Sequence, residues 1–127
     1  MASNAQFTAT PKVGIAALSV ANTNRDGSGT LGIVFTAGAN GSRVDKAVVR
    51  ATGTTTPGTV RLYIYNGTTA ALFTEVIVTA VTVSASTPAF EGVIDFLGGL
   101  VLPSGYSLRA STNNAETFNV VAFGGDF

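Results

Sequence analysis

The side chains of this chain that could do chemistry are carboxylates, amides and hydroxyls, because the sequence has no histidine and no cysteine. Histidine is the side chain whose ordinary pKa lies nearest neutrality, and cysteine is the most nucleophilic of the common side chains. Glu91 and Asp95 share a face of a predicted strand but lie about 13 Å apart at about 3.3 Å per residue. That distance is too long for the two carboxylates of a glycosidase. We therefore expect no catalytic residue, no cofactor and no enzymatic activity.

We expect these two carboxylates to lie in solvent and to pair with Arg61 or Arg109. A run of oxygen-bearing side chains over residues 22–28, NTNRDGS, imitates the start of a calcium-binding loop. Such a loop places a bidentate glutamate at its twelfth position, which is Ile33 here. The sequence therefore favours a turn held by hydrogen bonds from side chains to the backbone, with calcium as the weaker alternative, and predicts no metal site.

Positive charge gathers at one place in the chain, Arg43, Lys46 and Arg50, with Asp45 among them. On a regular strand Lys46 and Arg50 share one face and Arg43 takes the other. Seven basic residues balance seven acidic residues over the whole chain. A nucleic-acid surface needs an excess of positive charge. We therefore expect no nucleic-acid partner and interpret this cluster as surface or intersubunit ion pairs.

Tyr63 and Tyr65 stand on the polar face of the clearest predicted strand, opposite Val60, Leu62 and Ile64. Tyrosine is enriched in protein interfaces because it combines a large apolar area with one hydroxyl group. This pair is a candidate partner interface. Packing at a sheet edge and stacking on a sugar ring are the alternatives.

Both ends of the chain carry further candidate interface residues. Residues 1–11 are interpreted as an N-terminal arm, polar except for Phe7 and closed by a proline. A terminal phenylalanine either packs on its own domain or anchors in a neighbouring molecule. The terminal residues that we assign to a partner interface are Asn4, Gln6, Phe7, Thr8 and Phe127.

The remaining residues, 12–127, predict one β-sandwich domain. Short β-branched or alternating stretches recur at a spacing of about ten residues, separated by turns rich in glycine, asparagine and proline. About eight strands are expected, over residues 12–21, 30–36, 43–51, 60–65, 71–83, 90–97, 106–111 and 117–123. Eight antiparallel strands suit an all-β, jelly-roll-like sandwich, and an immunoglobulin-like sandwich is the alternative.

The overall composition favours association over chemistry. Charged residues make up 11% of the chain, against an average near 25%, and the mean hydropathy is +0.40. We expect part of this weakly charged surface to be buried against copies of the chain or against a partner. The first residues lack the basic and apolar regions of a signal peptide, and no stretch reaches the about 18 apolar residues of a membrane helix. Synthesis in the cytoplasm and no membrane partner are therefore expected.

Several stretches resemble a family of small structural proteins of tailed bacteriophage virions. They include ANTNRDGSGT at residues 21–30 and GLVLPSGYSLRAST at residues 99–112. The other similar stretches are residues 34–42, 50–56, 114–120 and 124–126. The similarity spans most of the chain from Ala21 onward, and its motifs are turns and strand edges without a catalytic signature.

The resemblance implies a capsid decoration, or cement, protein. Such a protein is made in the host cytoplasm and binds the surface of the assembled shell, where it bridges subunits of the major capsid protein. The resemblance also implies a homotrimer. The alternatives are a component of the tail or fibre, or a module that binds a glycan or receptor on the host surface.

Overall fold

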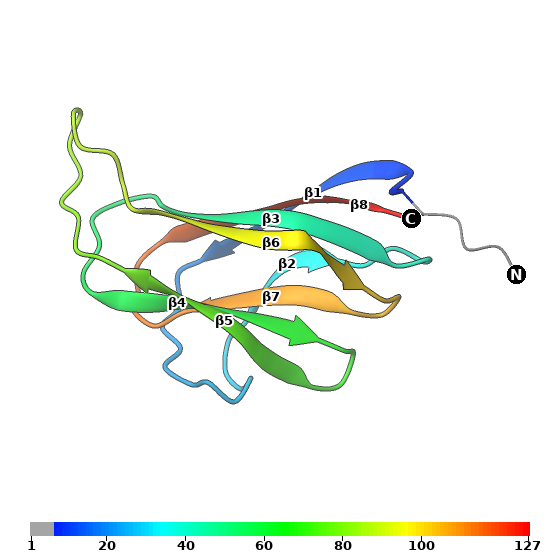
Figure 1. The fold of residues 1–127 in the computed structure, drawn as a ribbon. Coiled ribbons are helices and arrows are strands. Elements are labelled where there is room, and N and C mark those ends of the chain that lie inside the picture. Colours follow the sequence, from blue (N-terminus) through cyan, green and yellow to red (C-terminus); the bar gives the residue numbers. More distant parts are fainter. Residues whose placement is uncertain (1–6) are drawn as a thin grey trace, which may run out of the picture.

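The computed structural model describes residues 7–127, which form eight β-strands and no helix. The strands make two antiparallel sheets of four strands each, stacked as the two layers of a sandwich (Figure 1). The predicted all-β sandwich is therefore confirmed. Among the described residues no helix is long and apolar enough to span a membrane.

The two sheets are named A and B. The strands of sheet A, in spatial order, are β1 (Thr10–Leu18), β8 (Phe118–Asp126), β3 (Ser42–Ala51) and β6 (Glu91–Leu102). The strands of sheet B, in spatial order, are β2 (Gly32–Thr36), β7 (Ser107–Thr112), β4 (Gly58–Tyr65) and β5 (Ala70–Val78).

The pairing of the strands follows a jelly roll. The first strand pairs with the eighth, the second with the seventh, the third with the sixth and the fourth with the fifth. This nested pairing arises when one long antiparallel hairpin is rolled into two layers, which is the arrangement of a double-sheet jelly roll. It excludes the seven-stranded immunoglobulin-like order that the sequence left open.

The core lies between the two sheets and follows from the alternation of side chains along each strand. On β4, Val60 and Leu62 are fully buried and Ile64 packs against the core, as the sequence predicts. Phe35 and Phe118 fill the interior from β2 and β8. The core is mainly apolar, and a domain of this size needs no disulfide or metal to stabilise it.

The two open sides of the sandwich are closed to different degrees. On one side β1 lies directly against β2, because Gly14 has no side chain: a Cβ built there would lie 2.0 Å from the carbonyl oxygen of Val34. On the other side lie the edge strands β5 and β6 (Figure 1), and residues of both strands line a groove that is described below.

One predicted loop and the end of one predicted strand differ from the structure. Gly98 and Gly99 do not form a loop between strands but lie within β6, where their positive φ angles of 79° and 91° are accessible to glycine. One residue of β3, Asp45, stands opposite residues 96–99 of β6, so β6 bulges there. The predicted fifth strand ends at Val78, five residues early, because the chain then leaves the sheet in a long loop.

Candidate interaction surfaces

The outer face of sheet A carries an uninterrupted apolar row across all four strands. The register aligns Ile15 of β1 with Val121 of β8, Val121 with Val48 of β3, and Val48 with Val93 of β6. The side chains at the two ends of the row are the more exposed: Ile15 is 67% exposed and Val93 is 52% exposed. These residues alternate with the core residues of the same strands and therefore point away from the sandwich.

A second row extends this surface. Val13 of β1 pairs with Phe123 of β8, and both side chains are exposed. The row then continues through Lys46 and Asp95. We name the set Val13, Ile15, Val48, Val93, Val121 and Phe123 the outer A face. Contiguous exposed apolar surface of this kind, rimmed by charges, is typical of a protein interaction site.

The basic cluster lies on this same face, and the structure corrects one part of the prediction. The bulge at Asp45 shifts the alternation by one residue, so Arg43 shares the outer side of sheet A with Lys46 and Arg50. Arg43 forms an ion pair with Asp45 at 2.9 Å, and Arg50 forms one with Glu91 at 2.7 Å. Two of its three basic residues therefore form surface ion pairs within one chain.

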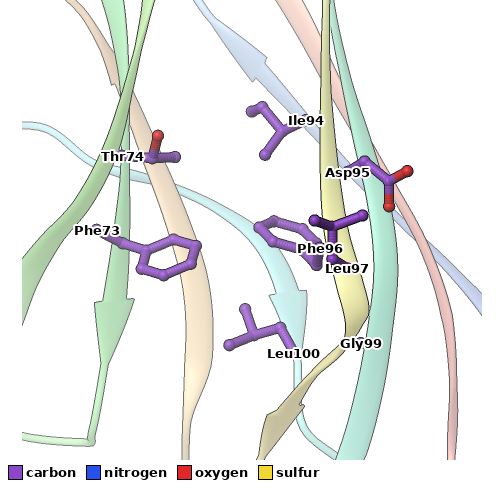
Figure 2. Close-up of a pocket in the computed structure, with 8 residues that line it drawn as sticks. All are labelled: Phe73, Thr74, Ile94, Asp95, Phe96, Leu97, Gly99 and Leu100. Atoms are coloured by element: carbon purple, nitrogen blue, oxygen red, sulfur yellow. The ribbon is translucent and has the colours of Figure 1, made fainter.

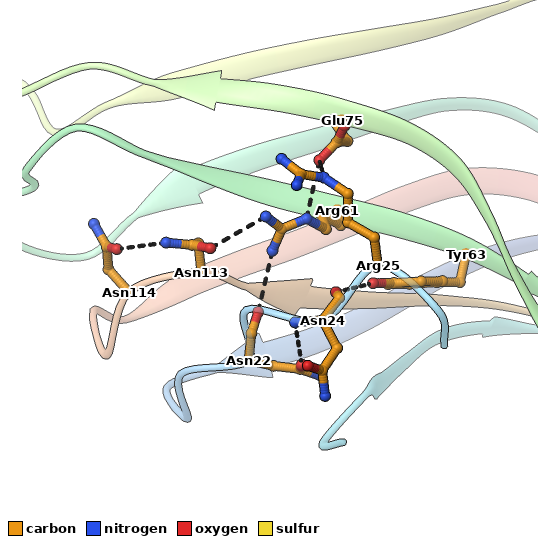
Figure 3. A network of polar contacts seen from close by, with 8 residues as sticks. All are labelled: Asn22, Asn24, Arg25, Arg61, Tyr63, Glu75, Asn113 and Asn114. Carbon is orange, nitrogen blue, oxygen red and sulfur yellow. Dashed lines mark hydrogen bonds and ion pairs between the residues drawn. The ribbon is translucent and has the colours of Figure 1, made fainter. Parts of the chain in front are cut away.

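The part of the outer face of sheet B around Arg61 and Tyr63 is covered by the segment that connects β1 to β2. Arg61 of β4 is 2% exposed under this segment and donates hydrogen bonds to the carbonyl oxygen of Asn22 and to Oδ1 of Asn113. Its Nε lies 2.9 Å from Glu75 Oε2, and Arg25 binds the same oxygen at 2.8 Å (Figure 3). One carboxylate thus joins the covering segment to the sheet.

Tyr63 is part of this covered face, which corrects its predicted exposure. It is 0% exposed, and its hydroxyl group donates a 2.8 Å hydrogen bond to the carbonyl oxygen of Asn24 (Figure 3). Tyr65 is half-buried, and the Arg109 guanidinium lies 3.7 Å from the centre of its ring. The two tyrosines do not form an exposed pair, so a partner can reach only Tyr65.

The covering segment is the turn that the sequence favours over a calcium loop. Asn22 Nδ2 donates to the carbonyl oxygens of Ser28 and Thr30, and Asn22 Oδ1 accepts from the Asn24 amide. The hydroxyl and amide groups of Ser28 both donate to Asp26, which lowers the pKa of that carboxyl group. Within residues 7–127, histidine, cysteine, aspartate and glutamate side chains form no group that could hold a metal ion.

The carboxylates have other partners than the sequence suggested. Glu91 pairs with Arg50, whereas Arg61 pairs with Glu75, so the expected pairing of Glu91 or Asp95 with Arg61 or Arg109 is wrong. The hydrogen bond from the Arg25 guanidinium holds the pKa of Glu75 below its usual range; desolvation opposes it, and Arg61 adds a smaller lowering effect. These contacts are structural ion pairs that join strands and loops.

The structure describes three of the five terminal residues that we assign to a partner interface. Asn4 and Gln6 lie outside the described residues. Phe7 is 81% exposed. Thr8 is half-buried against Gly125, where a Cβ on the glycine would lie 2.8 Å from it. Phe127 is half-buried, and its amide donates to the carbonyl oxygen of Gly41, so this terminal residue packs on its own domain.

A groove opens between the edge strands β5 and β6. Its volume is about 420 Å³, and its lining includes Phe73 of β5 and Ile94, Phe96 and Leu100 of β6. Figure 2 shows the three β6 side chains pointing toward Phe73, while Asp95 points away from the groove. The ring centres of Phe73 and Phe96 are 5.7 Å apart. The groove could not be predicted from the sequence, because its formation depends on the bulge in β6 and on which strands form the edges of the two sheets.

None of the known protein-family models matches the chain, and comparison with curated proteins finds no match either. The resemblance to virion proteins therefore stays a prediction.

Proposed function

We propose that this chain is a structural protein of a bacteriophage virion, a capsid decoration protein that binds the assembled shell and bridges its major capsid subunits. The outer A face carries this proposal. A four-stranded apolar surface flanked by charges suits a broad protein surface better than a small ligand. The resemblance of the sequence turns and strand edges to virion proteins supplies the biological setting.

A decoration protein needs a rigid body that presents one surface many times, and the fold supports this. Both sheets pack on one core, and the long β1–β2 segment is fixed to sheet B through Arg61, Tyr63 and Glu75. Many copies docked on a repeating shell allow weak single contacts to sum to a stable coat. We include the homotrimer in the proposal, because it would multiply the contacts of each docked unit.

Copy number in purified particles tests the proposal. We expect quantitative mass spectrometry to find hundreds of copies of the chain per virion. A handful of copies would contradict a role on the shell and favour the tail or fibre. Absence from finished particles would contradict any virion role.

A variant pair tests which face docks. Ile15→Lys introduces a charge into the outer A face, and Ile77→Lys introduces the same charge at an exposed position on β5 of the other sheet. Burial of an isoleucine contributes about 1.5–3 kcal/mol, so Ile15→Lys should weaken binding to stripped shells by at least about tenfold. Ile77→Lys should bind like the wild type. Equal binding by both variants would mean that the outer A face is not the docking face.

The alternative of a glycan-binding module has less support. Its sequence basis was two exposed tyrosines, and Tyr63 is completely buried. Inhibition of phage adsorption by the free protein would favour that alternative over the shell.

A further inference from the structure

We propose that the groove between β5 and β6 binds Phe7 of a second copy of this chain. This inference does not rest on the virion role, because it concerns only how copies of the chain bind one another. It starts from two features that remain unpartnered in a single molecule: an exposed phenylalanine at one edge of the sandwich and an apolar groove at the other.

The arm has the pattern of a strand with one apolar face. Ala5, Phe7 and Ala9 alternate with Gln6 and Thr8. Phe7 is 81% exposed in its own molecule. Residues 2–11 carry no charged side chain, which suits an apolar binding site.

The groove has the complementary chemistry. It is lined by phenylalanine, leucine and isoleucine side chains, and its one charged residue, Asp95, points away from it (Figure 2). Its volume of about 420 Å³ lies within the range of clefts that bind small apolar groups. The strands on both sides, β5 and β6, are edge strands with unpaired backbone groups, so an extended segment can add to either edge while its side chain enters the groove.

In its own molecule Phe7 is 81% exposed and is not among the residues that line the groove. The amide of Ala9 donates a 2.8 Å hydrogen bond to the carbonyl oxygen of Asp126, and Thr8 lies against Gly125, so both residues are fixed at the end of β8. β6 lies two strands from β8, about 10 Å across the sheet. The occupant of the groove is then the Phe7 of another copy.

A contact between Phe7 of one copy and the groove of the next joins two different surfaces, so it is a head-to-tail contact. Such head-to-tail contacts close into a ring when the rotation between copies allows it. The net charge of zero adds no overall repulsion between copies. A ring of three would give the expected homotrimer a structural basis.

Sedimentation of single variants gives the first test. Phe7→Ser removes the ring, and Leu97→Glu places a charge at the groove on a residue that is 89% exposed, so neither change threatens the core. Each should weaken self-association by at least about tenfold. Ile77→Glu, an exposed change on β5 away from the groove, should associate like the wild type. A wild type that stays monomeric at about 1 mM, or a Phe7→Ser variant that associates normally, would overturn the proposal.

Mixing the two defective variants gives the second test. The Phe7→Ser variant keeps an intact groove, and the Leu97→Glu variant keeps an intact Phe7, so one good contact can form between them. We expect a one-to-one complex in the mixture that neither variant forms alone. A symmetric contact through the outer A face would not respond in this way, and a mixture that remains monomeric would contradict the head-to-tail contact.

Discussion

Replacement of Tyr63 by phenylalanine tests whether this residue anchors the β1–β2 segment. The change keeps the buried ring and removes only the hydroxyl group, which donates a 2.8 Å hydrogen bond to the carbonyl oxygen of Asn24. A hydrogen bond of this kind contributes about 1 kcal/mol to the free energy of unfolding. That loss corresponds to a fall in Tm of about 3–5 °C for a domain of this size. Tyr65→Phe is the matched control, because its hydroxyl group bonds only within an exposed turn, to Gly67.

Urea denaturation and amide hydrogen exchange measure the two consequences. The Tyr63→Phe variant should unfold at lower urea concentration, and the amides of the β1–β2 segment should exchange about fivefold faster than in the wild type, since 1 kcal/mol corresponds to that factor. Tyr65→Phe should change neither quantity. If both variants match the wild type within about 0.3 kcal/mol and the segment exchanges at an unchanged rate, Tyr63 does not anchor it.

Two further changes test the packing and the electrostatics of the sandwich. Gly14→Ala should lower the free energy of unfolding by about 3 kcal/mol or more in urea denaturation. The new Cβ would lie 2.0 Å from the carbonyl oxygen of Val34 and would push β1 away from β2. Gly53→Ala is the control, because a Cβ at Gly53 meets no atom within 4 Å. The hydrogen bond from Ser42 lowers the pKa of Asp126 below 3.8, so its contribution to stability is fully present above that pH and is lost as the pH falls through the lower folded pKa. Asp126→Asn should therefore lose less stability than the wild type between about pH 6 and about pH 3, and an equal loss would contradict this role.

Much of the fold could be predicted from local sequence, because strand alternation and turn chemistry act over a few residues. Val60, Leu62 and Ile64 alternate with polar neighbours, and this pattern alone placed them toward the core. An Asn-Gly pair favours a hairpin turn, and β4 and β5 pair across Asn66-Gly67. Turn chemistry gave the wrong prediction at Gly98 and Gly99, because these two glycines form part of the bulge within β6.

The candidate surfaces were less predictable, because each depends on residues that are distant in sequence. Regular alternation predicts that Arg43 and Lys46 lie on opposite faces of the strand. The bulge at Asp45 places both on the outer side of sheet A. The alternation on β4 correctly predicts that Tyr63 lies on the face of the strand opposite the core. It cannot predict that the β1–β2 segment covers Tyr63 on that face. Amphipathic periodicity identifies which face a side chain takes, and it carries no information on what lies above that face.

The sequence by itself determined that this is an all-β protein, weakly charged and without histidine or cysteine. These properties follow from composition and from interactions between near neighbours. Only the tertiary structure decided the order of the strands, and with it which apolar residues line up across sheet A and which two edges leave a groove between them. Strand order is set by the packing of the whole chain on one core, so a surface that draws on four strands exists only once the chain is folded.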